Sequence, residues 1–375
     1  MGYLGQDIPK LGFGFMRLPQ NEIDGESVID IEQVKQMVDT FMAAGFTYFD
    51  TAWGYHGGHS EVALKEALVD RYPRESFQIV TKLPAWAADN TEDARAMFET
   101  SRKRLGVDYF DFYLLHNLGG ARSKRFDNYG IWDFLAEKKE QGFIKHLGFS
   151  IHDKADMLDR TLETHPEVEF VQLQINYADW ESPSVQSRKC YEVARAHGKP
   201  VVIMEPVKGG SLAKIPDSVK DIFESANPAV SVVSWALRFA ASLEGVVTVL
   251  SGMSTLAQVE ENVAIMKDFK PLSVEEQATI MKAQEKLDEI STVPCTDCGY
   301  CTQSCPQDVK IPTIMTSLSI LATYGDMWRA RENYKWNTED GEASRCIQCG
   351  LCESICPQHI KIVDELKRAV ELFED

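Results

Sequence analysis

The sequence predicts a (β/α)8 barrel followed by a small cysteine-rich domain. Eight strand-like runs alternate with helical stretches between residue 10 and about residue 268, and eight of the nine cysteines lie after residue 290. A chain of 375 residues suits one large domain with a small one, and an apolar share of 44% with a charged share of 26% is typical of a folded protein. We therefore expect a barrel over residues 1–290 and a second domain over residues 291–375.

The strand candidates are mostly continuous apolar runs, as expected for parallel strands that are buried on both faces. They are residues 11–16, 46–52, 77–83, 109–116, 145–151, 170–177, 200–206 and 246–252. The helical stretches between and after them are residues 32–44, 59–70, 91–105, 130–141, 153–163, 184–197, 229–241 and 255–268, with one more at 273–290. A doubly wound sheet is the main alternative, but no G-x-G-x-x-G follows an early strand.

The overall charge restricts the class of partner. Acidic residues outnumber basic ones by 57 to 39, which gives a formal charge of -18. Such a surface repels phosphate backbones, so we expect no nucleic-acid partner. No apolar run approaches about 20 residues and the N-terminus lacks a signal-peptide pattern, so we expect no membrane association and a cytoplasmic location.

Two four-cysteine motifs with the same spacing, C-x-x-C-x-x-C-x-x-x-C-P, occupy the C-terminal region. The first comprises Cys295, Cys298, Cys301 and Cys305, and the second Cys346, Cys349, Cys352 and Cys356. This spacing matches the bacterial 4Fe-4S run, in which the fourth cysteine binds the other cluster. We therefore expect two 4Fe-4S clusters with crossed ligands. One set is Cys295, Cys298, Cys301 and Cys356, and the other is Cys346, Cys349, Cys352 and Cys305.

Structural zinc is the alternative to clusters, because it also uses C-x-x-C pairs. Zinc does not account for two complete four-cysteine runs that each end in Cys-Pro. The 40 residues between Cys305 and Cys346 predict two helices, so this region resembles the helical dicluster ferredoxin domains. The remaining cysteine, Cys190, lies on an amphipathic helix and is interpreted as a packing residue.

Ionisable residues end three successive strands of the predicted barrel, and catalytic residues of such barrels lie at these ends. Asp50, Lys82 and His116 follow buried apolar runs, and Tyr55 lies in the loop that begins after Asp50. Each residue alone has a structural explanation, such as a cap, a loop aromatic or a core histidine. Their joint placement at strand ends favours chemistry.

These residues lie in motifs that resemble the aldo-keto reductase superfamily over roughly residues 8–268. The matching segments, in order, are GFGFMRLP, FDTAWGYHGGHSE, VTK, LLH, GFS and VVTVLSGMSTLAQVEEN. The resemblance implies that Asp50, Tyr55, Lys82 and His116 form a catalytic tetrad. A carbonyl that receives hydride needs a proton, which Tyr55 would donate. We expect the Lys82 ammonium to lower the pKa of Tyr55, Asp50 to hold Lys82, and His116 to orient the carbonyl oxygen.

The same resemblance implies a binding segment for NADP(H) or NAD(H). Its contact positions fall on Ser150, Gln172, Met204, Gly252, Ser254, Gln258, Glu261 and Asn262. Four positions depart from the family pattern. Ile151 replaces an asparagine, Met204 replaces a stacking tyrosine, and Gly252 and Gln258 replace the basic pair that reads the 2′-phosphate.

Three hypotheses follow. In the first, the protein is an oxidoreductase that reduces an aldehyde or ketone at the barrel mouth, with the clusters relaying electrons, and a redox protein is then a candidate donor. In the second, NAD(P)H alone supplies the electrons and the clusters are structural. In the third, the chain is a non-catalytic electron-transfer subunit, which the complete tetrad disfavours. The basic loop at 117–130 either attracts an anion or is simply solvated, and Trp53, Trp86 and Trp180 either line a pocket or pack.

Overall fold

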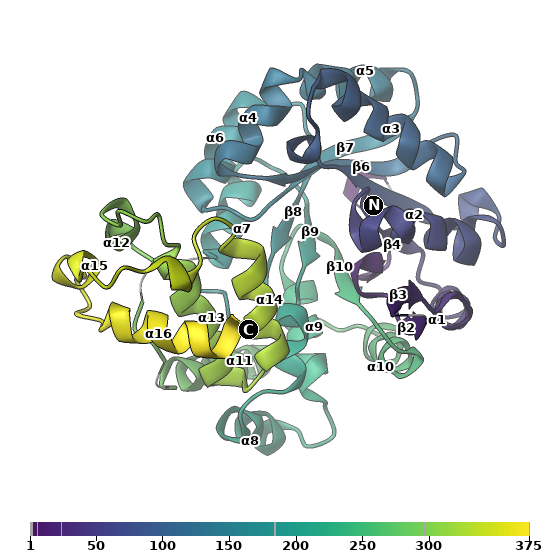
Figure 1. Ribbon diagram of the computed structural model, residues 1–375. Coiled ribbons are helices and arrows are strands. Elements are labelled where there is room, and N and C mark those ends of the chain that lie inside the picture. Colours follow the sequence, from purple (N-terminus) through teal and green to yellow (C-terminus); the bar gives the residue numbers. More distant parts are fainter. Residues whose placement is uncertain are drawn as a thin grey trace. The chain divides into compact units, whose positions relative to one another are not determined.

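The computed structural model describes residues 3–5, 7–23, 25–183, 185–290, 292–295 and 297–374. Eight parallel strands form a closed barrel in the order β1-β10-β9-β8-β7-β6-β5-β4 (Figure 1). The barrel strands are β1 (Leu11–Gly14), β4 (Tyr48–Asp50), β5 (Gln78–Leu83), β6 (Phe110–Leu118), β7 (Ile144–Ile151), β8 (Phe170–Gln174), β9 (Val201–Met204) and β10 (Val246–Gly252). The predicted (β/α)8 barrel is confirmed.

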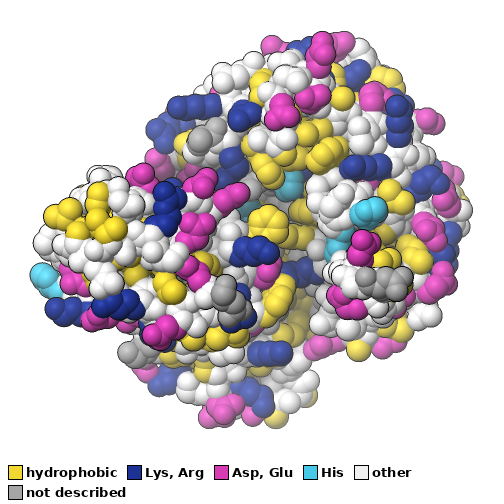
Figure 2. All heavy atoms as spheres, viewed as in Figure 1, with side chains coloured by type: hydrophobic (Ala, Val, Ile, Leu, Met, Phe, Trp, Pro, Cys, Tyr) yellow, Lys and Arg dark blue, Asp and Glu magenta, His cyan; other side chains and the backbone are white. Residues whose placement is uncertain are grey.

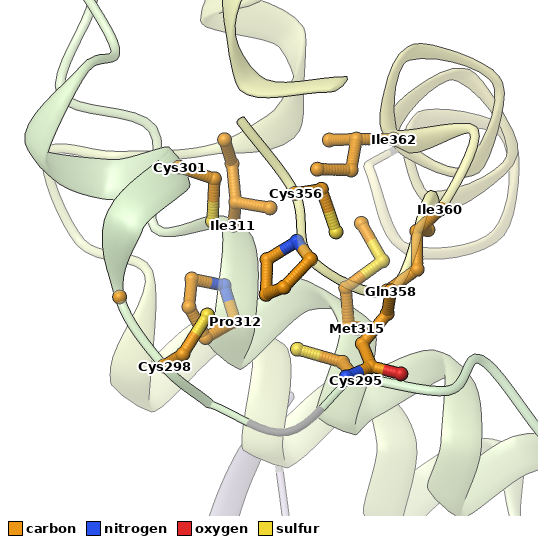
Figure 3. A pocket seen from close by; sticks show the side chains of 12 residues that line it. Cys295, Cys298, Cys301, Ile311, Pro312, Met315, Cys356, Gln358, Ile360 and Ile362 are labelled. Carbon is orange, nitrogen blue, oxygen red and sulfur yellow. The ribbon is translucent and has the colours of Figure 1, made fainter. Parts of the chain in front are cut away.

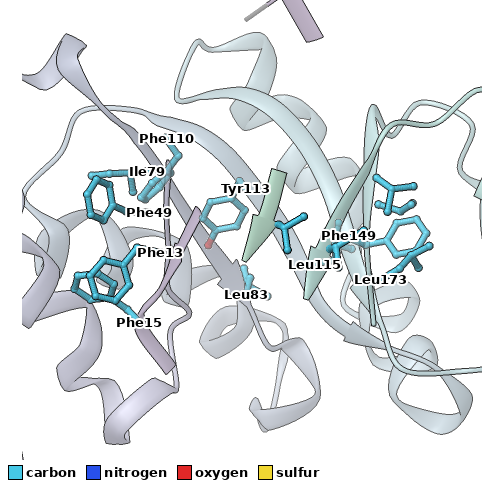
Figure 4. Packing of buried hydrophobic residues seen from close by; sticks show 14 of the residues in the cluster. Phe13, Phe15, Phe49, Ile79, Leu83, Phe110, Tyr113, Leu115, Phe149 and Leu173 are labelled. Carbon is cyan, nitrogen blue, oxygen red and sulfur yellow. The ribbon is translucent and has the colours of Figure 1, made fainter. Parts of the chain in front are cut away.

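Side chains along each strand alternate between the barrel interior and the layer beneath the helices. Interior positions such as Tyr48, Val80 and Leu114 form one buried cluster. Their neighbours in the sequence, such as Phe49 and Leu115, belong to the larger cluster between sheet and helices (Figure 4). Because the period is two residues, a polar residue two positions after an interior one also faces inward.

Nine helices of the described chain accompany the barrel strands. They are α1 (Ile31–Ala43), α2 (His59–Leu64), α3 (Thr91–Leu105), α4 (Gly120–Asn128), α5 (Ile131–Glu140), α6 (Ala155–Thr164), α7 (Ser187–Ala196), α9 (Val232–Ser242) and α10 (Leu256–Met266). Local signals explain their limits. The Asn90 side chain accepts a hydrogen bond from the amide of Asp93 at the start of α3, and Gly106 ends that helix in a left-handed conformation (φ 66°).

Two elements differ from the sequence expectation. The basic segment at 117–130, expected as a loop, contains helix α4, in which Arg125 donates hydrogen bonds to the Ala88 carbonyl and the Tyr129 hydroxyl. An antiparallel hairpin, β2 (Gln20–Ile23) with β3 (Glu26–Ile29), precedes α1. The strand pattern did not find it, because both strands are mostly exposed and polar and present no apolar run to the core.

The described residues pack into two compact units. One comprises residues 1–207 and 233–273, and the other comprises residues 208–232 and 274–375. The second unit therefore includes more of the chain than its cysteine-rich part. The boundary expected at residue 291 rests on a change in composition, and it stays a prediction because packing units and independently folding domains need not coincide.

The second unit is helical. Its helices are α8 (Asp217–Ala226), α11 (Val274–Asp288), α12 (Tyr300–Gln303), α13 (Ile311–Tyr324), α14 (Met327–Asn337), α15 (Leu351–Ser354) and α16 (Ile362–Phe373). Helix α8 packs on α11, and α13 packs on both α14 and α16. The two helices predicted between the cysteine motifs are thus present as α13 and α14. Cys301 on α12 and Cys352 on α15 are buried in the core of this unit.

The surface carries charges of both signs. On the face that Figure 2 shows, acidic and basic side chains are interspersed among the described residues. Within the described part of the chain, no helix is long and apolar enough to cross a membrane.

Candidate functional site

Three of the four predicted catalytic residues lie at the carboxyl ends of adjacent strands. Asp50 ends β4, Lys82 lies near the end of β5, and His116 lies near the end of β6. Each follows an interior residue by two positions, namely Tyr48, Val80 and Leu114. The pleat therefore turns all three side chains toward the same end of the barrel interior.

Lys82 is the centre of this group. Its Nζ atom donates to Asp50 Oδ1 at 2.5 Å and to the Thr51 carbonyl at 2.7 Å, and it lies 3.4 Å from the Tyr55 hydroxyl oxygen. The side chains of Lys82 and Asp50 are 1% and 4% exposed, so the pair is almost completely removed from water. The structure thus brings Asp50, Tyr55 and Lys82 into one hydrogen-bonded group.

His116 completes the group from the third strand. Its ring lies edge-on to the Tyr55 ring, with the ring centroids 5.7 Å apart. Among the described residues, the Nδ1 atom of His116 has no hydrogen-bond partner although it is buried, and the same holds for Oδ2 of Asp50. Trp86 donates from its indole nitrogen to the His116 carbonyl at 2.9 Å, so this tryptophan stands beside the group. A buried imidazole nitrogen in this state can form a hydrogen bond with a polar atom of a ligand.

The environment sets the protonation states. Burial raises the pKa of Tyr55 above its ordinary value, and the nearby Lys82 ammonium acts in the opposite direction without reversing the shift. Burial is the largest effect on the pKa of Lys82 and acts to lower it, but Asp50 and Tyr55 together outweigh burial, so the net pKa is raised. Burial, followed by the charge of Lys82, lowers the pKa of His116 well below its ordinary value. At neutral pH the group therefore holds a protonated tyrosine, a charged lysine and a neutral histidine.

The outcome for Tyr55 corrects one expectation. The sequence argument considers only the lysine and predicts a lowered tyrosine pKa. In the folded protein, removal of the hydroxyl from water has the larger effect, so its pKa is raised. Tyr55 keeps its proton at neutral pH, and Lys82 is placed to stabilise the phenolate that forms when the proton leaves.

Two of the residues implied for nicotinamide binding lie side by side. Ser150 on β7 pairs in register with Gln172 on β8, and both are 2% exposed. The Ser150 hydroxyl oxygen accepts from the Asn117 amide at 2.8 Å. Gln172 Nε2 contacts the Met204 sulfur at 3.7 Å, while Gln172 Oε1 is buried and has no hydrogen-bond partner in the part of the chain that the structure describes. An amide oxygen in this state fits the amide group of a nicotinamide carboxamide.

The remaining implied contacts surround the start of α10. Ser254 donates from its hydroxyl to the Arg17 carbonyl at 2.7 Å, and Gln258 Oε1 accepts from the Ser254 amide at 2.7 Å. Asn262 is buried and donates to Ser251 Oγ at 2.9 Å, whereas Glu261 is exposed on the helix. These contacts tie the segment to the turn that follows β1 and to β10.

Gly252 lies at the end of β10, and the sequence analysis missed its neighbour Arg17. A Cβ atom built on Gly252 would lie 3.3 Å from Arg17 Cδ and 3.5 Å from Cγ. The stem of Arg17 therefore occupies the space beside residue 252, where the family has a basic side chain. The pairing of Gly14 with Gly252 brings β1, and with it Arg17, next to β10. Only this pairing of distant strands shows that Arg17 lies beside residue 252.

The eight C-terminal cysteines line two cavities, four each. The first, of about 350 Å³ with part of it open to solvent, is lined by Cys295, Cys298, Cys301 and Cys356 (Figure 3). The second, of about 320 Å³, is lined by Cys305, Cys346, Cys349 and Cys352. Each cavity takes three cysteines from one motif and the fourth from the other. The structure thus groups the cysteines in the two crossed sets expected from the sequence.

The cavities suit a cluster better than a single ion. Among the described residues, no group of three or more His, Cys, Asp or Glu side chains is arranged to hold a metal ion. The sulfur atoms of the first set instead surround an apolar space to which Ile311, Met315 and Ile360 contribute. Four cysteine thiols around such a space match the four ligands that a 4Fe-4S cluster takes.

The other residues singled out in the sequence have structural surroundings. Cys190 is buried on α7, and burial raises the pKa of its thiol to about 11, which agrees with a packing residue. Arg122 on α4 donates from Nε to the Asn117 carbonyl at 3.0 Å. Trp180 packs edge-on against the Phe239 ring, so its environment among the described residues is a packing one.

Known proteins resemble both parts of the chain. Residues 10–285 match the aldo/keto reductase family, and residues 273–361 match a 4Fe-4S dicluster domain. An aldo-keto reductase of Mycolicibacterium smegmatis is 32% identical over 148 residues, which are 39% of this chain and 47% of that protein. The chain thus spans about half the length of this curated relative. A 9,11-endoperoxide prostaglandin H2 reductase of Trypanosoma cruzi is 27% identical over 284 residues, 74% of this chain and 88% of that protein.

A solved structure supports the fold. The aldo-keto reductase of Klebsiella pneumoniae in complex with NADPH superimposes with a TM-score of 0.56 at 22% identity, covering 73% of this chain and 90% of that one. The family match covers well over half of the sequence and includes every barrel strand. Together with the match to the C-terminal region, it confirms the predicted fusion of such a barrel to a 4Fe-4S dicluster domain. The chain belongs to the aldo/keto reductase family.

Proposed function

We propose that the barrel reduces the carbonyl group of an aldehyde or ketone to an alcohol, with Tyr55 as proton donor. The observation that carries this proposal is Lys82, whose ammonium contacts both the Asp50 carboxylate and the Tyr55 hydroxyl. Reduction adds a hydride to the carbonyl carbon and a proton to the oxygen. The raised pKa of Tyr55 keeps its proton available, and Lys82 stabilises the phenolate after transfer.

In this scheme His116 positions the carbonyl oxygen of the substrate. Its neutral imidazole stands beside the Tyr55 ring and has a buried nitrogen without a partner. A carbonyl oxygen between the tyrosine hydroxyl and the imidazole receives two hydrogen bonds, which fix its orientation during the transfer. The role of Asp50 is to keep the buried Lys82 ammonium charged.

The residues on β7 and β8 fit a nicotinamide cofactor, which when bound supplies the hydride. Ser150 and Gln172 would hold its carboxamide, because the Gln172 oxygen lacks a partner and the two residues are adjacent in register. The Met204 side chain contacts Gln172 and would pack beside the ring. Ser254, Gln258, Glu261 and Asn262 would contact the rest of the cofactor around the start of α10.

The preference between NADPH and NADH is expected to be weak. Gly252 and Gln258 bring no positive charge to the position that reads the 2′-phosphate, so Arg17, beside residue 252, stands in place of the family's basic pair, and Gln258 already accepts a hydrogen bond from the Ser254 amide. Titration of protein fluorescence with each cofactor measures this directly. We expect both to bind with similar affinity. An absence of binding by either would leave the clusters as the only source of electrons.

The cysteine cavities would hold two 4Fe-4S clusters, which exchange single electrons. Ile311 lines both cavities, so the two sites lie on either side of one side chain. Cys298 and Cys349 are exposed, so each site has an edge that a one-electron donor protein can approach. These features support a redox part for the clusters and a redox protein as partner.

A structural role is the competing function, and a different observation favours it. Cys301 and Cys352 are buried in the hydrophobic core of the C-terminal unit, and Cys295, Cys305, Cys346 and Cys356 pack against it. Metal ligation at these positions would contribute folding energy outright. The two roles predict different behaviour of reduced clusters on addition of substrate.

Direct product analysis tests the proposed reaction. Cluster-loaded protein is incubated without oxygen with benzaldehyde and NADPH, and benzyl alcohol is quantified by chromatography. We expect catalytic amounts of the alcohol. A failure to reduce benzaldehyde and a panel of aliphatic aldehydes and ketones, with either cofactor or with a chemical reductant, would contradict the proposal.

A further inference from the structure

The loop that carries Tyr55 has an unusual backbone. It leaves the barrel with two hydrogen bonds to β5, from the Thr51 amide to the Val80 carbonyl at 2.9 Å and from the Trp53 amide to the Lys82 carbonyl at 3.2 Å. After Tyr55, three consecutive residues up to Gly58 have positive φ angles of 51°, 63° and 94°. The position of Tyr55 therefore depends on whatever holds the two ends of this turn.

Arg104, near the end of α3, lies against both ends of this turn and is hydrogen-bonded to the first. Its Nη1 atom donates to the Trp53 carbonyl at 2.8 Å, and its guanidinium carbon lies 5.0 Å from the centroid of the Trp53 ring. A Cβ atom built on Gly58 would lie only 2.7 Å from Arg104 Nη2. The missing side chain at Gly58 thus makes room for the guanidinium, which lies against the loop before and after Tyr55.

Glu61 holds the Arg104 guanidinium through an ion pair. This glutamate on α2 is completely buried, and its Oε2 atom lies 3.3 Å from Arg104 Nη1. Its other oxygen accepts from the Thr81 hydroxyl at 2.7 Å. A buried carboxylate is costly unless it is paired and hydrogen-bonded, and both oxygens are satisfied here. Because Thr81 precedes Lys82, the contacts connect the lysine strand to the tyrosine loop.

We propose that Arg104 is a positioning residue for Tyr55, which acts through Trp53 and is held in place by Glu61. This inference rests on the proposed role of Tyr55 as proton donor. The Tyr55 hydroxyl lies 3.4 Å from Lys82 Nζ, close to the limit for a hydrogen bond. A displacement of the loop by a fraction of an ångström would break this contact, whereas the buried Lys82–Asp50 pair would remain.

Arg104→Lys is the primary test, because the alanine variant would leave the Glu61 charge buried without a partner. Lysine keeps the positive charge. It lacks the planar guanidinium, with its several N–H donors, that lies against the Trp53 ring. We expect kcat for benzaldehyde to fall by up to about 100-fold with little change in KM, because the proton donor is misplaced while substrate binding is kept. Arg102→Lys is the matched control. Arg102 lies two residues earlier on α3, pairs with Glu99 and stacks on Phe143.

The pH dependence separates positioning from a general loss of stability. The charged or titratable groups that act on Tyr55 are Lys82, Asp50 and Glu205, and the neutral His116 ring stands beside it. If the loop moves away from Lys82, the lysine lowers the tyrosine pKa less. The alkaline limb of kcat/KM that reports Tyr55 should then move to higher pH in Arg104→Lys and stay in place in Arg102→Lys.

A readout without turnover completes the test. Ultraviolet difference titration of each protein against its own Tyr55→Phe variant isolates the ionisation of this phenol, and we expect it at higher pH in Arg104→Lys. The paired variant Glu61→Gln with Arg104→Met removes both charges together and should give the same shift. Unchanged kcat and an unchanged phenol titration in Arg104→Lys would overturn the inference. Full activity of Tyr55→Phe would instead overturn the proposed function, so the two failures are distinguishable.

Discussion

Lys82 Nζ and Asp50 Oδ1 lie 2.5 Å apart in a pair that is almost completely buried. A lone ammonium in such a place would lose its proton, because burial disfavours the charged form. Asp50, with Tyr55, outweighs this tendency, and the pKa of Lys82 is raised. The proposed stabilisation of a Tyr55 phenolate by Lys82 thus depends on Asp50, a residue that need not touch the substrate.

Replacement of Lys82 tests this dependence. Lys82→Met removes the charge beside Tyr55, so we expect the pKa of the tyrosine to rise further and kcat to fall by about 100-fold or more. Steady-state kinetics and the alkaline limb of kcat/KM measure both effects. The double variant with Asp50→Asn is the control, because it removes the buried carboxylate that Lys82→Met leaves without a partner. If the double variant regained wild-type turnover, the lysine would have only a structural part.

Tyr55→Phe tests the proton donor itself. The change deletes one hydroxyl group and keeps the ring against His116, so folding and cluster content should be unaffected. We expect kcat to fall by about 10²- to 10⁴-fold, the usual contribution of a positioned acid. Tyr129→Phe, which removes a hydroxyl that binds backbone carbonyls near Ala88, serves as control. Wild-type rates in Tyr55→Phe would contradict the barrel chemistry.

Metal analysis tests the two crossed cysteine sets. We expect about eight iron and eight acid-labile sulfide per chain after anaerobic purification. Cys356→Ser should impair the cluster held by Cys295, Cys298 and Cys301 rather than that of its own motif. Cys190→Ser should leave both clusters intact, because Cys190 lines neither cavity. Stoichiometric zinc without visible absorbance would refute the cluster assignment.

The redox role of the clusters can be followed by electron paramagnetic resonance. Dithionite-reduced protein, freed of excess reductant, is mixed anaerobically with a carbonyl substrate in the absence of nicotinamide. One carbonyl takes two electrons, one from each reduced cluster, and two protons to become an alcohol, so we expect the signal of the reduced clusters to disappear in step with alcohol formation. Clusters that stay reduced, while added NADPH alone drives turnover, would show that their role is structural.

The lowered pKa of His116 predicts that the free energy of unfolding depends on pH. Burial lowers its pKa well below the ordinary value of 6.5, so the unfolded chain binds a proton more readily than the folded one in the window just below that value. The stability that neutral His116 confers is present above this window and is lost as the pH falls through it. Thermal midpoints of cluster-loaded protein between about pH 7.5 and 5.5 should fall more steeply for the wild type than for His116→Gln.

A second histidine provides the reference for this measurement. Burial also lowers the pKa of His56, which contributes equally to the wild type and to His116→Gln, so the difference between their slopes isolates His116. Equal slopes for the wild type and His116→Gln would mean that His116 is hydrated in the folded protein.

Local patterns in the sequence were sufficient for the barrel and for the positions of the tetrad. Buried parallel strands are apolar runs, and a two-residue period carries Asp50, Lys82 and His116 inward from Tyr48, Val80 and Leu114. The exposed hairpin over residues 20–29 and helix α4 lack such a pattern, because neither presents a continuous apolar run to the core. Cysteine spacing likewise indicated the ligand sets, since a short loop can reach only neighbouring corners of one cluster.

Tertiary structure alone decided the features that join distant segments. Asp50 and Lys82 are 32 residues apart, and their 2.5 Å contact exists only because β4 and β5 pair in register. The contact of Arg104 with Trp53 joins residues 51 positions apart, and no local pattern records it. Burial, which depends on the whole fold, sets the direction of the Tyr55 pKa shift against the neighbouring charge. The sequence by itself determined which chemical groups are present and which way each strand turns them, whereas solvent exclusion and long-range contacts determined their charge and distance.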